Sequence, residues 1–157
     1  MRIAGAYALP LSRERAFALL QNPIALARAM PGCEALDLVG ENEYAMRMKM
    51  VLASMSGLFD GKVRIADSNP PESFRLVVEG QGKIGFMKGD GVLTLAPVDG
   101  VDGAAPGCRV QYAGDVQVGG TMAAVGQRLI DTTARMLIKR FFEKLNREAA
   151  AESHVAA

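Results

Sequence analysis

The side chains that most often carry out catalysis are scarce in this chain of 157 residues. A single histidine, His154, argues against histidine-based acid–base catalysis and His-rich metal sites. The two cysteines, Cys33 and Cys108, are far apart and not in CxxC spacing, which excludes a zinc knuckle or a thioredoxin-like site. The low number of cysteines indicates a reducing compartment, although one disulfide between these two remains an alternative. We therefore predict no catalytic and no metal-binding residue.

The carboxylates do not form a catalytic pair either. Asp60, Glu79 and Asp115 alternate with apolar residues that point to the opposite face, so they should face outward. Asp131 lies three and four residues from basic side chains on a helical segment, a spacing typical of surface ion pairs. The GxGxxG string at 80–85 lacks the following helix that would hold a pyrophosphate.

Methionines provide the positive signal. Met46, Met48 and Met50 share one face of the strictly alternating segment 43–52. Thioether side chains adapt to irregular apolar surfaces, whereas a specified solid core would favour Ile, Leu and Val. The stripe therefore indicates a deformable cavity for an elongated apolar ligand, with an ordinary methionine-containing core as the alternative. Four more methionines could face the same interior: Met30, Met87, Met122 and Met136.

Small residues suggest where the space would lie. Gly126 falls inside the predicted long helix, where glycine costs about 1 kcal/mol relative to alanine. Gly61 and Gly114 occupy inward strand positions opposite it. This arrangement provides either room for a ligand or close packing of helix on sheet. The predicted lining of the pocket is Met46, Met48, Met50, Phe59, Val63, Phe74, Phe86, Met122, Gly126 and Leu129.

The far end of the predicted long helix is basic and aromatic. Five residues there form a candidate contact surface for an anionic membrane or a partner protein: Ile138, Arg140, Phe142, Lys144 and Arg147. The alternative is that Phe142 packs on the N-terminal strand or a short helix of its own domain. The segment 51–58 is apolar for a hairpin turn and is a candidate second docking point.

These residues must be positioned by a regular series of elements. The pattern predicts a strand at 2–9, two short helices at 13–20 and about 23–30, and six consecutive strands. One long amphipathic helix should follow from 121 to about 151. Glycines in the strand at 83–95 suggest a bulge or a sharp bend. This order is α+β, an antiparallel sheet of about seven strands whose concave face is covered by the long helix.

Composition limits the class of protein. A net charge of +1 provides no global field for nucleic acid. No apolar run approaches the roughly 18 residues of a membrane span, and the N-terminus lacks a signal-peptide core. Residues 1–150 should form one domain, with 151–157 as a flexible tail.

Several motifs are similar to those of a known family. They are Asn22-Pro23, Pro31-Gly32-Cys33-Glu34, Asn42-Glu43-Tyr44, 59–63, 69–73, Gly89-Asp90-Gly91, Val118-Gly119-Gly120 through 126–131, and Phe141-Phe142. On these motifs, residues 2–147 resemble the CoxG family of carbon monoxide dehydrogenase proteins, within the helix-grip (SRPBCC, START-like) superfamily. The resemblance implies the helix-grip fold: a sheet wrapped around a long C-terminal helix, with two short helices after the first strand.

The resemblance also implies a function. It predicts a non-catalytic accessory protein that binds an apolar ligand, with a quinone as the leading candidate. The implied partner is a molybdenum-containing carbon monoxide dehydrogenase or related oxidoreductase, and no cofactor is required. The protein would be cytoplasmic, with possible peripheral contact at the inner face of the membrane. The alternatives are an assembly factor with an incidental cavity and, less favoured, a cyclase-like enzyme.

Overall fold

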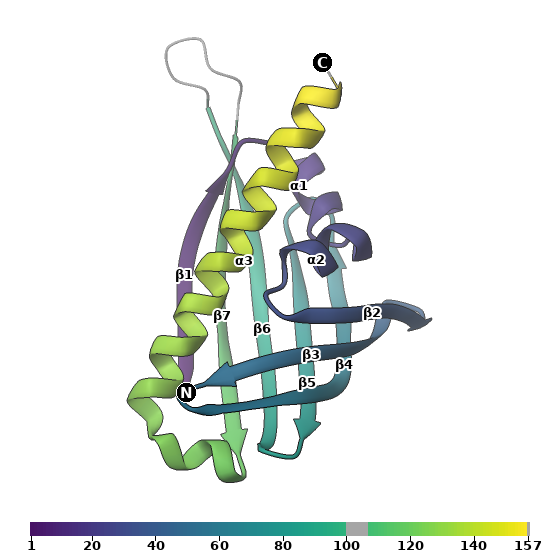
Figure 1. Ribbon diagram of the computed structural model, residues 1–157. Coiled ribbons are helices and arrows are strands. Elements are labelled where there is room, and N and C mark those ends of the chain that lie inside the picture. Colours follow the sequence, from purple (N-terminus) through teal and green to yellow (C-terminus); the bar gives the residue numbers. More distant parts are fainter. Residues whose placement is uncertain (100–106, 157) are drawn as a thin grey trace.

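The computed structural model describes residues 1–99 and 107–156, with side chains up to residue 149. An N-terminal strand is followed by two short helices, six strands, a 3-10 helix and a long helix (Figure 1). The helices are α1 (Arg13–Leu19), α2 (Pro23–Ala29), η1 (Thr121–Val125) and α3 (Gln127–Ala156). The strands are β1 (Arg2–Leu9), β2 (Cys33–Gly40), β3 (Glu43–Leu52), β4 (Met55–Asn69), β5 (Ser73–Gly82), β6 (Gly85–Val98) and β7 (Gly107–Gly119).

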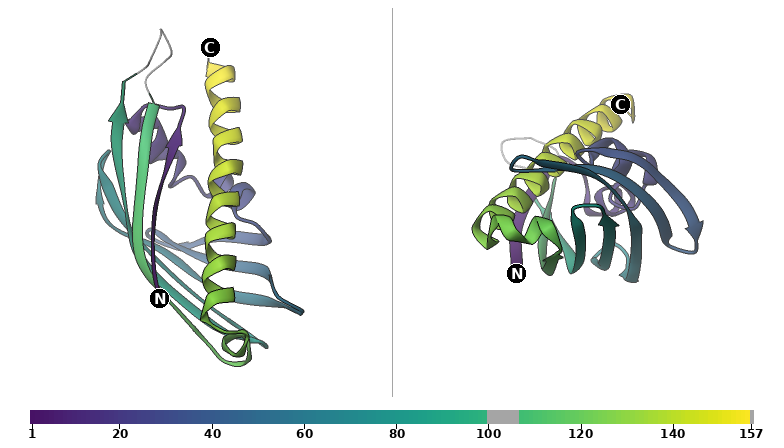
Figure 2. Two further views of the ribbon diagram at one scale, coloured as in Figure 1. Left: turned by 90° about the vertical axis from the view of Figure 1, so that its left-hand side faces the viewer. Right: turned by 60° about the horizontal axis from the view of Figure 1, so that its bottom comes forward.

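All seven strands form one antiparallel sheet in the order β1-β7-β6-β5-β4-β3-β2. Strands β2 to β7 follow one another as a meander, and β1 pairs with β7, so that Ile3 lies opposite Gly114. The sheet curls strongly, and α3 crosses its concave side (Figure 2). The predicted helix-grip α+β architecture is confirmed.

The two short helices begin where their caps predict. The Ser12 hydroxyl oxygen accepts a hydrogen bond from the Arg15 amide at 3.3 Å, and the Asn22 side-chain oxygen accepts from the amides of Ile24 and Ala25. Pro23 occupies the first turn of α2, where its missing N–H costs nothing. These caps fix the turn that carries the chain from β1 across to the far edge of the sheet.

Glycines allow the strands to bend. Gly61 lies opposite Gly80 in the β4–β5 register, and Gly91 lies opposite Gly114 in the β6–β7 register. A β-carbon on Gly114 would come within 2.7 Å of the Asp90 carbonyl oxygen, so the backbones approach too closely for a side chain there. The register of β6 with both neighbours is unbroken. Of the two features predicted for this strand, a bulge or a sharp bend, the bulge is absent from β6.

The predicted single helix from residue 121 was also wrong. Residues Thr121–Val125 form a 3-10 helix, and Gly126 separates it from α3 with a φ of 96° and a ψ of 150°. This conformation is restricted almost entirely to glycine. Gly126 therefore ends one helix and redirects the chain into the next. At its other end α3 continues to Ala156, through the stretch predicted as a tail.

Candidate ligand-binding cavity

A cavity of about 330 Å³ lies between the concave face of the sheet, α2 and α3. Apolar side chains from every layer line it, among them Leu26 and Met30 from the α2 region and Leu76 and Val78 from β5. On α3 the lining residues are Ala134, Leu137, Ile138, Phe141 and Phe142, at the i, i+3, i+4 spacing of one helical face. The volume is at the lower end of the range for small-molecule sites.

The three methionines of β3 face this cavity. Burial alternates strictly along the strand, so Met46, Met48 and Met50 all line the cavity wall, and Met46 is only 4% exposed. Met30 and Met87 line it as well. Five of the nine methionines of the chain thus surround one space. Because each side chain has three flexible bonds, this wall can adjust to ligands of different shapes.

The other predicted lining residues divide into three groups. Val63 and Phe74 line the cavity. Phe59 and Met122 are buried, but neither is among the residues that line it. Phe86 and Leu129 are exposed on the surface, so their predicted place in the pocket was wrong. Phe86 lies on the outer face because its neighbour Met87 points inward and side chains alternate along a strand.

The role predicted for Gly126 is also corrected. Gly126 is exposed, and a β-carbon built on it would meet nothing within 4 Å. The residue therefore does not make room under a helix; its positive φ requires glycine. Gly114 does line the cavity, whereas Gly61 faces the β5 backbone. Met136, which the sequence also suggested for the interior, is 40% exposed.

Three polar residues touch the cavity. Asp90 and Asp115 contribute from the sheet, but their carboxylates form surface ion pairs: Asp90 with Arg75 Nε at 2.8 Å, Asp115 with Arg2 at 3.3 Å. Hydrogen bonds from Arg75 hold the pKa of Asp90 below its ordinary value. The third residue, Tyr112, is occupied by stacking against Phe142. Among the described residues, no inward carboxylate pair offers general acid–base catalysis.

The structure places Phe142 in the core. Its side chain is 3% exposed, and its ring stacks on Tyr7 at a centroid distance of 5.2 Å and on Tyr112 at 5.6 Å. The predicted contact of Phe142 with a membrane or partner was therefore wrong, and packing on the N-terminal strand is what occurs. Ile138 likewise faces the cavity.

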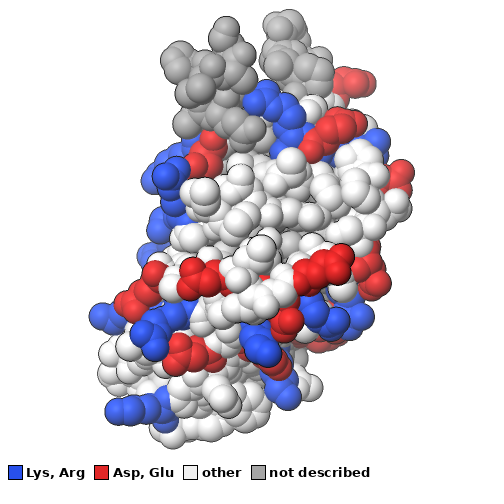
Figure 3. All heavy atoms as spheres, turned by 90° about the vertical axis from the view of Figure 1, so that its right-hand side faces the viewer, with Lys and Arg blue, Asp and Glu red and all other residues white. Residues whose placement is uncertain are grey.

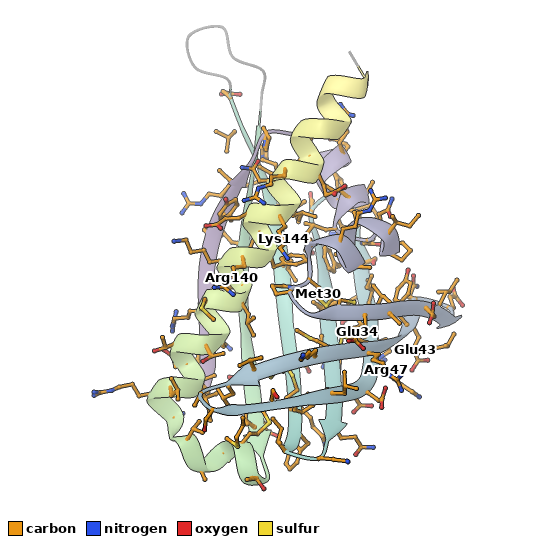
Figure 4. The ribbon with its side chains drawn as sticks, viewed as in Figure 1. Met30, Glu34, Glu43, Arg47, Arg140 and Lys144 are labelled. Atoms are coloured by element: carbon orange, nitrogen blue, oxygen red, sulfur yellow. The ribbon has the colours of Figure 1, made fainter. Side chains whose placement is uncertain are left out.

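The basic residues of the same helix remain at the surface. Arg140 and Arg147 are exposed and Lys144 is half-buried (Figure 4). Lys144 lies one turn before Glu148, which pairs with Arg28 of α2 at 3.6 Å, so this side of α3 faces α2. Without Phe142, the apolar part of the predicted contact surface is missing at this end.

Three further residues of α3 line the cavity outside the predicted set: Ala134, Leu137 and Phe141. A signal for them exists. When the helical period is counted only from Gln127, after the glycine, these residues and Leu145 fall on one face. The expected helix included residues 121–125, and placing Met122 on the inward face selected the stripe with Leu129 and Met136 instead.

The two cysteines take no part in the cavity. Both are free thiols; Cys33 is half-buried and Cys108 is buried. Burial raises the pKa of both thiols above the ordinary value, which disfavours the reactive thiolate. Within the described residues, no cluster of three or more His, Cys, Asp or Glu side chains could hold a metal ion.

A curved antiparallel sheet wrapped around a long helix over an apolar cavity defines the helix-grip class of folds, which START-like structures share. Three solved structures show the likeness. A conserved protein from Geobacillus kaustophilus is 31% identical, with 96% of each chain covered and a TM-score of 0.88. A START superfamily protein from Mycobacterium smegmatis is 12% identical, covers 96% of this chain and 97% of its own, and has a TM-score of 0.72. The Zhui aromatase/cyclase from Streptomyces sp. R1128 is 9% identical, covers 100% and 98%, and has a TM-score of 0.67.

Within that class, residues 5–150 match the model of the CoxG family, whose name denotes a carbon monoxide dehydrogenase subunit. The chain belongs to this family. No curated protein sequence matches it significantly. None of the helices in the described part of the chain is long and apolar enough to cross a membrane.

Proposed function

We propose that this protein binds an elongated apolar small molecule in the cavity under α3 and serves an oxidoreductase as a non-catalytic accessory. The cavity itself is the observation that carries the proposal. Its wall is almost entirely carbon and sulfur, and the two carboxylates at its edge are engaged by arginines on the outer face. Such a wall favours burial of apolar surface over any chemical step.

The free energy needed for this function comes from burial alone. Each Å² of apolar surface removed from water contributes about 25 cal/mol, so an isoprenoid-sized chain gains several kcal/mol. That gain suffices for reversible uptake and release. A quinone as ligand and a molybdenum-containing carbon monoxide dehydrogenase or a relative as partner are the finer part of the proposal. The family name supports the partner enzyme, and the apolar wall of the cavity suits a quinone.

Two measurements test the proposal. An organic extract of the purified protein, analysed by mass spectrometry, should contain a co-purified quinone or lipid. Binding of a fluorescent apolar probe should then be compared between the parent and Gly89→Leu. Gly89 lines the cavity, and a β-carbon there makes only an ordinary contact of 3.9 Å with Val116, so leucine should fill the space without strain.

The matched control is Thr94→Leu, which adds the same side chain to the exposed outer face of the same strand. We expect Gly89→Leu to abolish probe binding and Thr94→Leu to leave it unchanged. A clean extract, together with unchanged probe binding in Gly89→Leu, would contradict the proposal. Tight binding to an oxidoreductase under those conditions would favour an assembly factor with an incidental cavity.

A further inference from the structure

Three connections meet at the end of the molecule opposite the C-terminus of α3 (Figure 1). They are the β3–β4 turn, the β5–β6 turn, and η1 with the first turn of α3. A β-carbon on Gly57 would lie 3.4 Å from Ile84, so the β3–β4 turn lies against the β5–β6 turn. The Met122 amide donates to the Ile84 carbonyl oxygen at 2.7 Å, which joins the β5–β6 turn to η1. We call this end the turn pole and define it by residues 49–58, 81–89 and 116–130.

The turn pole contains no acidic residue in any of its segments. It carries four cations, Lys49, Lys83, Lys88 and Arg128. Lys88 lies opposite Glu79 of β5, but the other three form no ion pair within the described residues. The chain as a whole has nearly equal numbers of acids and bases, 17 and 18, so this segregation is local. Figure 3 shows the lowest part of the visible face in white and blue, with red only above it.

Large apolar side chains are exposed at the same end. Val51 is 60% exposed and Leu58 48%, both on the β3–β4 hairpin. Phe86 is 43% exposed beside the β5–β6 turn, and Leu129 is 37% exposed in the first turn of α3. Hairpin turns normally carry small and polar residues. Apolar residues on three adjoining turns, flanked by unpaired cations, have no role in the core of this domain.

We propose that the turn pole docks reversibly on an anionic lipid bilayer. The cations complement the negative surface potential of anionic lipid, and the four apolar side chains can enter the boundary between headgroups and acyl chains. Two or more weak anchors of this kind give association that is reversible and sensitive to salt. The basic end of α3 lacks this combination, because Phe142 is in the core.

The location of the turn pole suits exchange between bilayer and cavity. Val116 lines both the cavity and a surface depression formed with Phe86, Ala123 and Ile130. Met50 and Met87, on strands that end at the turn pole, line the cavity wall. Docking there would bring the interior of the protein close to the lipid. The docking itself is independent of which ligand the cavity holds.

Co-sedimentation with vesicles tests the inference on the full chain. Vesicles of phosphatidylcholine alone should be compared with vesicles that also contain phosphatidylglycerol, each at low and high salt. We expect binding only to the anionic vesicles, and loss of that binding at high salt. Lys83→Gln and Arg128→Gln should each weaken binding about fivefold, and Val51→Ser with Leu58→Ser should weaken it further.

Two controls make the result specific. Leu38→Ser with Val39→Ser removes equally exposed apolar residues from β2, and Arg140→Gln with Lys144→Gln removes two cations of α3 that lie outside the turn pole. Both control variants should bind as the parent does, and thermal melting should show all variants folded. The inference is overturned if the parent fails to sediment with anionic vesicles at low salt, if the controls weaken binding as much as the turn-pole variants, or if the turn pole binds only a protein.

Discussion

Phe142 is the residue whose surroundings differ most from the sequence-based prediction. In the sequence it stands among Arg140, Lys144 and Arg147 and suggests an exposed basic–aromatic surface. In the structure its ring lies between Tyr7 of β1 and Tyr112 of β7. The ring therefore packs α3 against β1 and β7. Its contribution is to stability, and this can be measured.

Phe142→Ala should reduce the free energy of unfolding by about 3–5 kcal/mol, because it removes a fully buried ring and both stacking contacts. Urea unfolding followed by circular dichroism measures the loss. Met136→Ala, on the exposed side of the same helix, is the control and should change stability by less than about 0.5 kcal/mol. Equal and small effects for both variants would contradict the packing described for Phe142.

The cysteines give a prediction with a defined pH dependence. Burial raises the pKa of Cys33 and Cys108, so the thiolate forms at higher pH in the folded protein than in the unfolded chain. Below the thiol pKa of the unfolded chain, the thiols are protonated in both states and do not lower the free energy of unfolding. As the pH rises above that value, thiolate forms first in the unfolded chain, and the free energy of unfolding falls. Labelling of the native protein with an aromatic disulfide reagent should be slow at neutral pH, and slower for Cys108 than for the half-buried Cys33.

Single Cys33→Ser and Cys108→Ser variants assign the two rates. Unfolding in urea should make both thiols react at the rate of a free cysteine. Rapid labelling of Cys108 in the native protein at neutral pH would contradict its burial.

At the scale of elements, the break at Gly126 determines which face of α3 meets the sheet. The 3-10 helix keeps Met122 buried beside the β5–β6 turn, and α3 then starts in a new direction. In α3, Ala134, Leu137 and Phe141 face the cavity. A continuous helix from residue 121 would have turned a different stripe inward.

Gly126→Ala should therefore lower the free energy of unfolding by about 1–3 kcal/mol, although open space surrounds the position. Thermal or urea unfolding measures the change. Gly40→Ala is the control, because Gly40 is also exposed and its φ lies outside the left-handed region. If Gly126→Ala were neutral and instead weakened binding of an apolar probe, the role of Gly126 would be to provide space after all.

At the scale of the whole molecule, the fold places the methionines in different environments. Met46, Met48 and Met50 are almost completely buried on the cavity wall, whereas Met136 is well exposed on the outer side of α3. The sulfur of an accessible methionine is oxidised to a sulfoxide first. The pattern of oxidation therefore reports both the fold and the occupancy of the cavity.

Limited oxidation with hydrogen peroxide, followed by peptide mass spectrometry, should modify Met136 well before Met46, Met48 and Met50. Adding a quinone analogue should slow oxidation of the half-buried Met30, which lines the cavity, and leave the rate at Met136 unchanged. Equal protection of both residues would indicate that the analogue only scavenges peroxide. Oxidation of the β3 methionines first would contradict the orientation of that strand.

Local information in the sequence was sufficient for most of the elements, the break at Gly126 being the exception. Ser12 and Asn22 cap helices where a capping residue predicts a start, and the alternation along 43–52 places three methionines on one face. Both signals depend only on neighbours within a few residues. The order of these elements then limits the architecture, because six consecutive strands and one long helix can bury their apolar faces only against each other. The predicted fold and the methionine wall of the cavity are accordingly present.

The remaining site residues depend on contacts between distant parts of the chain. Phe86 and Met87 are adjacent, and only the pairing of β6 with β5 and β7 decides that Met87 faces the cavity and Phe86 the surface. Phe142 is buried because its ring packs on both β1 and β7. These two strands pair with each other although about a hundred residues separate them along the chain. Gly126 carries its positive φ between η1, which hydrogen-bonds to the β5–β6 turn, and α3, which crosses the sheet. Amino-acid type and periodicity thus determined which surfaces are apolar, and tertiary packing decided which of those surfaces line the cavity.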